Sequence, residues 1–154
     1  MISQTAEYAL RAMVVLLGKE IPPGSYLAAQ DIATRTKVPV DYMAKILNAL
    51  VKARLVVAQR GRNGGCKAAR LASEISVLDI VQAVDPIRRI ETCPLKLASH
   101  GIRLCPLHRR LDDAIRTVEE AFRSTTFAEL LNEPTESKPL CESARIYHVQ
   151  SAAL

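Results

Sequence analysis

Apolar residues recur every three or four positions along the first third of the chain, which is the spacing that places them on one face of a helix. The pattern predicts an amphipathic helix over residues 4–18, a short second helix over 28–36 and a third over 39–55. Pro39 suits the first turn of the third helix, where a missing N–H group costs no hydrogen bond. The second and third helices, joined by a short turn, predict a helix-turn-helix. The buried stripe of the third helix comprises Met43, Ile46, Leu47 and Leu50.

A β-hairpin is predicted directly after the third helix. Residues 56–59 can form one strand, and residues 67–71 can return as the second. Gly61, Gly64 and Gly65 lie between them and tolerate positive φ angles, so the chain can reverse there. A basic hairpin that follows a helix-turn-helix is typical of the wing of a winged helix.

Two more helices follow the hairpin. Ser76 can cap a helix over residues 76–85, and residues 106–124 read as a long helix. The stretch between them predicts a loop that can include a short helical turn. The apolar stripe of the long helix is narrow, so it can belong to the core or to a dimer interface. It comprises Leu107, Leu111, Ile115, Val118 and Phe122.

These elements predict a mainly α fold with a small β-hairpin: a winged helix-turn-helix with a long C-terminal dimerisation helix. We expect a DNA-binding domain over residues 1–85, a loop rich in cysteine and histidine over 86–105, and a dimerisation helix region over 106–131. After residue 131 the periodicity ends and Pro, Ser and Glu become frequent, which predicts a flexible tail over 132–154.

Composition and charge favour a nucleic-acid partner. The chain is 49% hydrophobic but only 4% aromatic, so its core must be aliphatic, which suits helices. The net charge is +5, and between Tyr42 and Ser73 seven residues are basic and none is acidic. A solvated face usually mixes both signs, so this run favours a polyanion. The alternative is a solvated basic hairpin with no role in binding. RGRNGG is not a P-loop, because no Lys-Ser/Thr pair follows it.

Geometry assigns candidate roles to six DNA-binding residues. The N-terminal part of the third helix should enter the major groove of double-stranded DNA. Lys45 could read guanine or hold a phosphate, and Tyr42 could hold a phosphate. Asp41 could accept from cytosine or simply favour the helix N-terminus. The full set is Asp41, Tyr42, Lys45 and Asn48 in the helix, with Arg60 and Arg62 in the wing; Arg62 is the candidate for minor-groove insertion.

The chain is predicted to be cytoplasmic, with no membrane partner. Glu7 and Arg11 interrupt the first apolar run, no basic region precedes it, and no segment reaches the roughly eighteen apolar residues that a membrane span needs. In that compartment clustered thiols favour metal or redox chemistry over structural disulfides.

The sequence ETCPLKLASHGIRLCPLH, residues 91–108, gathers Cys93, His100, Cys105 and His108. Each cysteine precedes a proline, which makes it a candidate helix N-cap where the helix dipole stabilises a thiolate. Two sulfurs and one or two imidazoles suit zinc or an iron–sulfur cluster with mixed ligands. The alternative is a buried thiol and a surface histidine without a shared function.

The two halves together resemble the Rrf2 family of winged-helix transcription factors, of the IscR and NsrR type. The resemblance covers residues 1–131. It implies a homodimer that binds a palindromic operator and, in several members, a 2Fe–2S cluster that switches DNA affinity. It rests on TAEYALRAMVVL, DIATRTKVPVDYMAKILNALVKARLV, RGRNGG, SVLDIVQAVD and the two CPL tripeptides.

The resemblance also implies a cluster site, with one departure. The family pattern has three evenly spaced cysteines; Cys93 and Cys105 match the first and third, but Ser99 stands at the middle position. Serine is a poor iron ligand. The missing ligands could come from His100, from His108, which matches the histidine ligand of IscR-like members, or from Glu7 of the partner subunit, which matches an acidic ligand of NsrR-like members.

We therefore expect a transcriptional repressor that senses redox state, nitric oxide or iron–sulfur status through a 2Fe–2S cluster. One alternative keeps DNA binding but replaces the cluster by a Cys93–Cys105 disulfide switch or a zinc site. A remote alternative is a small cysteine enzyme that uses Cys105 with a histidine. Otherwise the chain is expected not to be an enzyme.

Overall fold

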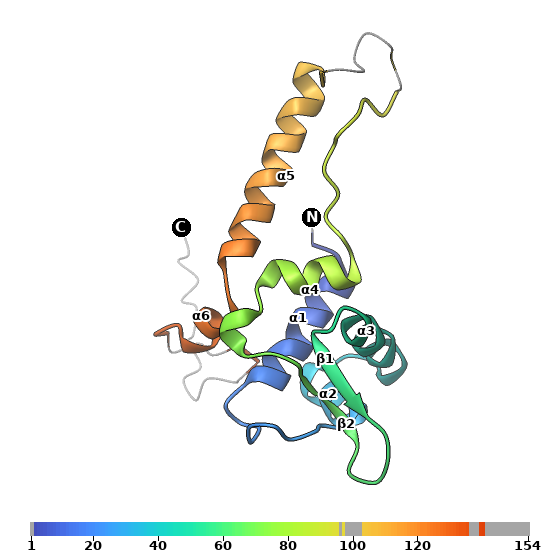
Figure 1. Cartoon of the computed structure of the whole chain (residues 1–154), viewed down its shortest axis with the longest axis vertical. Coiled ribbons are helices and arrows are strands. Elements are labelled where there is room, and N and C mark those ends of the chain that lie inside the picture. Colours follow the sequence, from blue (N-terminus) through green and yellow to red (C-terminus); the bar gives the residue numbers. More distant parts are fainter. Residues whose placement is uncertain (1, 96, 98–102, 136–138, 141–154) are drawn as a thin grey trace, which may run out of the picture.

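The computed structural model describes residues 2–95, 97, 103–135 and 139–140. It confirms a mainly helical chain with one two-stranded antiparallel hairpin (Figure 1). A single 3-10 turn, η1, links the hairpin to the next helix. The elements are α1 Gln4–Leu17, α2 Ala29–Thr36, α3 Val40–Lys52, β1 Val56–Gln59, β2 Gly65–Ala68, η1 Ala72–Glu74, α4 Val77–Val84, α5 Pro106–Ser124 and α6 Phe127–Asn132.

Helices α1 to α4 enclose one core, which is aliphatic as the composition predicts. Met13, Ile32, Met43 and Leu50 are fully buried. The start of α4 is fixed by a serine cap. Ser76 accepts from the Asp79 backbone at 3.2 Å, while the Asp79 carboxylate accepts from the Ser76 backbone at 2.8 Å. This capping box confirms Ser76 as the cap of α4.

The hairpin differs from the prediction at its second strand. β2 covers residues 65–68 instead of 67–71, and Gln59 pairs with Gly65. The reason is a close approach that only glycine permits. Gly65 has φ +150°, and a Cβ there would lie 2.4 Å from the Leu27 carbonyl oxygen. Leu27 in turn exchanges two backbone hydrogen bonds with Cys66, so the start of β2 is fixed against the segment before α2.

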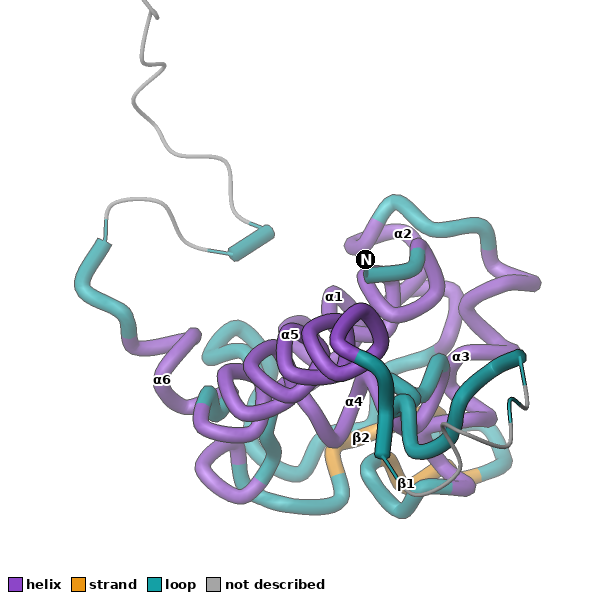
Figure 2. The backbone as a smooth tube through the Cα atoms, turned by 90° about the horizontal axis from the view of Figure 1, so that it is seen from above, coloured by secondary structure: helices purple, strands orange, loops and turns teal. Residues whose placement is uncertain are grey.

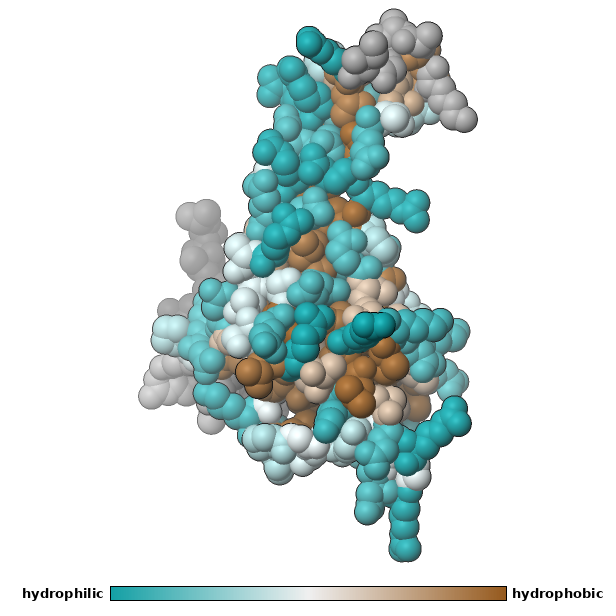
Figure 3. All heavy atoms as spheres, in the orientation of Figure 1, coloured by the Kyte–Doolittle hydropathy of each residue, from teal (hydrophilic) through white to brown (hydrophobic). Residues whose placement is uncertain are grey.

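Helix α5 and the segment 86–95 that leads up to it form an arm that rises from the body of α1–α4 (Figure 1). Seen from above, α5 is viewed nearly along its axis (Figure 2). No residue of α5 is buried, and Leu107 and Leu111 are 64% and 48% exposed. Hydrophobic side chains gather along one side of the arm (Figure 3). Only near its base does α5 join the body, where Phe122 packs with Val77 and Val81.

The region predicted as one dimerisation unit, residues 106–131, contains two helices. The chain turns at Thr125, and α6 packs back on the body: Phe127 is 0% exposed and its N–H donates to the Ile75 carbonyl. The break is caused by a capping box, because Thr126 and Glu129 satisfy each other's backbone N–H groups. The hydrogen bonds from Thr126 also lower the pKa of Glu129.

Of the predicted tail, residues 136–138 and 141–154 lie outside the described residues, so its flexibility stays a prediction. None of the helices in the described ranges is long and apolar enough to cross a membrane.

Candidate nucleic-acid interface and cysteine site

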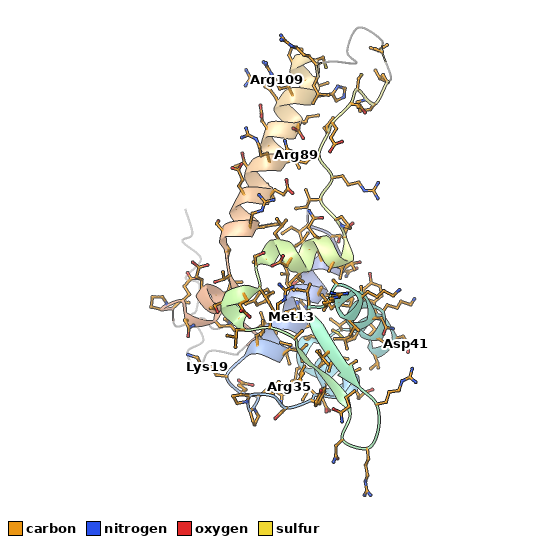
Figure 4. All side chains as sticks on the ribbon, in the orientation of Figure 1. Met13, Lys19, Arg35, Asp41, Arg89 and Arg109 are labelled. Carbon is orange, nitrogen blue, oxygen red and sulfur yellow. The ribbon has the colours of Figure 1, made fainter. Side chains whose placement is uncertain are left out.

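Helix α3 is the second helix of the helix-turn-helix and carries three of the predicted DNA contacts on one exposed face. Asp41, Lys45 and Asn48 follow one another at four- and three-residue steps and are all exposed. The opposite face is buried in the core through Met43 and Ile46. Asp41 lies at the outer side of α3 (Figure 4). The arrangement leaves one polar face of α3 free to meet a groove.

Tyr42 has partners within the protein that the sequence did not reveal. Its hydroxyl makes a short hydrogen bond with the Thr5 hydroxyl of α1. Its ring meets the edge of Tyr8 with 5.8 Å between the ring centroids. The half-buried Tyr42 side chain therefore joins α3 to the first turns of α1.

The hairpin presents only basic charges. Arg60 and Arg62 flank its turn and are exposed, as a DNA-binding wing requires. Lys67, on β2, places its ammonium 4.6 Å from the centre of the Tyr26 ring, which keeps that charge against the body. The space-filling view shows hydrophilic residues over the hairpin end of the molecule (Figure 3).

Cys105 and His108 are brought together at the far end of the arm. Cys105 is the N-cap of α5 with Pro106 at the first position, as predicted. Its Sγ lies 3.2 Å from Nδ1 of His108, one turn into the helix. A thiol next to an imidazole at a helix N-terminus is placed to ionise and to bind a metal.

Cys93 is buried, with 4% of its surface exposed. The prediction that it caps a helix is wrong: Pro94 and Leu95 form a turn. A proline permits a helix start, but the described residues beyond it do not continue as one. Ser99 and His100 lie outside the described residues, so their predicted roles stay predictions.

Glu7 lies in the first turn of α1, where it forms an ion pair with Arg11 at 2.6 Å. Arg11 also donates to the Thr36 carbonyl at the end of α2, at 3.2 Å. Within the described part of the chain, no three His, Cys, Asp or Glu side chains are gathered to hold a metal. One chain thus supplies a Cys–His pair of the donor types that suit iron or zinc, but it does not gather Glu7 with them.

An ion-pair clamp, which sequence reasoning missed, holds the arm together. The Arg89 Nε donates to Oδ1 of Asp112 at 2.7 Å, and the Ile90 N–H donates to the same oxygen at 2.9 Å. Glu119 lies 3.7 Å from the same guanidinium. These hydrogen bonds hold the pKa of Asp112 down at about 2. The clamp fixes the segment before Cys93 against α5, and no local sequence signal marks it.

Comparisons with known proteins agree with this architecture. The Rrf2 family, described as an iron-dependent transcriptional regulator, matches residues 2–133. The helix-turn-helix-type transcriptional regulator Rv1287 of Mycobacterium tuberculosis is 33% identical over 133 residues, covering 84% of this chain and 80% of that protein. Among solved structures, T. potens IscR matches with a TM-score of 0.69 at 24% identity, covering 88% of this chain and 89% of that one.

CymR, the global cysteine regulator of B. subtilis, matches with a TM-score of 0.66 at 22% identity, covering 85% of this chain and 95% of that one. At such identities the two structures show the shared winged-helix fold. The family match gives no support to the alternative of a cysteine enzyme. The chain belongs to the Rrf2 family and is a DNA-binding transcriptional regulator.

Proposed function

We propose that this protein is a homodimeric, cytoplasmic repressor that binds a palindromic operator and senses redox state, nitric oxide or iron–sulfur status through a 2Fe–2S cluster. The observation that carries the proposal is the Cys105–His108 pair, 3.2 Å apart, at the start of the helix with the exposed apolar stripe. A metal-binding pair at that place can report its state directly to the dimer interface.

Dimerisation is supported by the solvent exposure of α5. Leu107 and Leu111 lie one helical turn apart and would be covered by the same stripe of a second chain. Ile115 and Val118, which are only half-buried, continue the stripe toward the body. The domain division proposed here keeps residues 1–85 for DNA and 106–124 for the partner, while α6 returns to the body.

The proposed cluster ligands are Cys93, Cys105 and His108 or His100 of one chain, with Glu7 of the partner. Bound there, the cluster would supply a one-electron redox centre. The remaining work falls to the protein's own residues. Arg11 holds the Glu7 carboxylate within a free chain, so ligation by Glu7 requires that this ion pair open. Arg11 would then keep only its hydrogen bond to Thr36, next to the turn that leads into α3.

In the proposed complex with DNA, the exposed face of α3 enters the major groove and the wing follows the backbone. Asp41, Lys45 and Asn48 are the proposed base or phosphate contacts, and Arg60 and Arg62 the proposed wing contacts. Two such units must fit half-sites separated by about one helical turn of DNA or a multiple of it. A change at the start of α5 that alters the dimer would therefore alter affinity at both half-sites.

The test is the visible absorption spectrum of protein purified without oxygen, with iron, sulfide and zinc assayed on the same sample. We expect charge-transfer bands and equal amounts of iron and sulfide, both of them absent in Cys105→Ala. Cys66→Ala is the matched control, because Cys66 is buried in the hairpin and should leave the spectrum unchanged. DNA affinity is then compared for oxidised, reduced and cluster-free protein, and equal affinities would overturn the switch.

A thiol or zinc switch is the second candidate, favoured by the incomplete donor set of the described residues. Protein that stays colourless after reconstitution with iron and sulfide would support it. Bound zinc would then identify a zinc site, and loss of the response in Cys93→Ala without any metal would identify a disulfide switch.

A further inference from the structure

Both helices of the helix-turn-helix end in the same way, with a basic residue in the left-handed conformation. Lys37 follows α2 with φ +56°, and Arg54 follows α3 with φ +59°. These are two of the three non-glycine residues with positive φ in the described chain, and the third, Leu140, lies outside the helical body. The conformation costs free energy for any residue with a Cβ, so its use at both ends of α3 needs a reason.

The hydrogen bonds show that each end is a Schellman motif. After α2, Lys37 N–H donates to Thr34 and Val38 N–H to Ala33. After α3, Arg54 N–H donates to Val51 and Leu55 N–H to Leu50. The residue that follows each basic residue, Val38 or Leu55, is buried in the core. Glycine is the usual residue at the left-handed position of this motif, because it adopts that conformation without strain.

Neither basic side chain is used inside the described part of the protein. Lys37 and Arg54 are both exposed, and no hydrogen bond, ion pair or ring contact engages them there. Their charges bracket α3, which rises over thirteen residues or roughly 20 Å. The major groove is about 12 Å wide, so the two ends of a helix lying across it reach the phosphates on either wall.

We propose that Lys37 and Arg54 are DNA-binding residues that hold backbone phosphates at the two ends of α3. The inference rests on the proposed entry of α3 into the major groove and adds two residues to that interface. The rival explanation is that each cation favours the C-terminal dipole of its own helix. The two explanations differ in measurable ways: a dipole interaction acts on stability alone, whereas a phosphate interaction acts on DNA binding and on its salt dependence.

The experiment uses full-length protein with Lys37→Gly and Arg54→Gly, and two observables. Thermal unfolding should show an unchanged midpoint or a rise of about 2–4 °C, because the strain of the left-handed residue is removed. Fluorescence anisotropy with a labelled mixed-sequence duplex, followed from 50 to 300 mM salt, should show a salt slope smaller by about 0.9 for each phosphate that the variant no longer holds. At 0.1 M salt, relative to 1 M, each such phosphate corresponds to about an eight-fold weaker affinity.

Two further variants control for charge and for side-chain chemistry. Lys19→Asn removes one positive charge on the side of the molecule away from Asp41 and α3, and should leave the salt slope unchanged (Figure 4). Lys37→Arg keeps the charge and should keep the slope. An unchanged slope in both glycine variants, or a lowered unfolding midpoint with unchanged DNA binding, would overturn the inference while the proposed function stands. Wild-type protein that binds no duplex at all would overturn both.

Discussion

Single side chains fix the two places where α1 meets the helix-turn-helix. Tyr42 and Thr5 join α3 to α1 through their hydroxyls, and Arg11 joins α1 to the end of α2. Both interactions come from the same two turns of α1 that carry Glu7. Residues that were candidates for outside partners therefore also have structural work within one chain.

Replacing Tyr42 by Phe separates its structural role from a role at DNA. The hydroxyl hydrogen bond is removed while the ring packing on Tyr8 stays, so the free energy of unfolding should fall by about 1 kcal/mol. Thr5→Ala should cost a similar amount, and the double variant little more, because both remove one shared bond. Urea unfolding measures this. A reduced salt slope of DNA binding in Tyr42→Phe would instead support the phosphate interaction that the sequence predicted.

Asp112→Asn should destabilise the protein in a pH-dependent way. The pKa of Asp112 is depressed from 3.8 to about 2, first by the hydrogen bonds from Arg89 and then by the Ile90 N–H. A carboxyl with a lowered folded-state pKa contributes stability above its unfolded pKa and loses it as the pH falls. The difference in unfolding midpoint between wild type and variant should therefore be full at pH 7 and shrink between about pH 4 and pH 2.

Asp113→Asn is the matched control for that experiment. Asp113 is the next residue, but its side chain is half exposed and pairs with Arg116 on the surface of α5. Exposed ion pairs contribute little to stability, so this variant should change the midpoint slightly at any of these pH values. A destabilisation equal to that of Asp112→Asn would mean that the Arg89 clamp contributes nothing special.

At the scale of elements, α5 differs from every other long helix of the protein in how little of its apolar stripe is buried. Helices α1 and α3 bury their stripes in the core, whereas α5 touches the body only near its base. Its ends are fixed nevertheless, by the Arg89–Asp112 clamp on one side and by the turn at Thr125 on the other. A helix held in this way presents its stripe to a second copy.

Leu111→Asn should convert the proposed dimer into monomers. A dimer would lose two buried leucine side chains, about 3–6 kcal/mol together, which raises the dissociation constant by at least about 100-fold. Thr117→Asn introduces the same residue away from the stripe and should leave the mass unchanged. Light scattering after size-exclusion chromatography, over a range of concentrations, measures both. An unchanged dimer in Leu111→Asn would mean that α5 is not the interface.

The whole molecule separates its two functional ends. The hairpin lies at one end of the long axis and Cys105 at the other, with the start of α1 between them (Figure 1). A cysteine site at the end of the arm therefore cannot reach α3 of its own chain directly. A second chain, packed along α5, is the proposed means by which α1 and its Glu7 come to the cysteines.

Mixed dimers test this exchange of ligands. Chains with Glu7→Ala and chains with Cys105→Ala should each lose the cluster as homodimers. Co-expressed with two different affinity tags, the heterodimer should hold about half the iron of wild type, because one site still joins an intact Cys105 to an intact Glu7. A heterodimer without iron would mean that each site takes all its ligands from one chain.

The sequence by itself determined the elements that depend on neighbours a few residues apart. Helical periodicity located α1 to α5, Ser76 marked a cap, and the Thr126–Glu129 spacing carried a second capping signal that the prediction overlooked. It also located the Cys105 cap beside His108, since three residues on one helix start suffice to bring them together.

Only the tertiary structure decided which distant segments meet. Residues 89 and 112 meet because a loop returns along α5, and residues 5 and 42 meet because α3 crosses α1. The register of the hairpin depended on Leu27, far from either strand, which allows no side chain at Gly65. Periodicity states which face of an element is apolar, but the partner of that face is set by how all the elements pack at once.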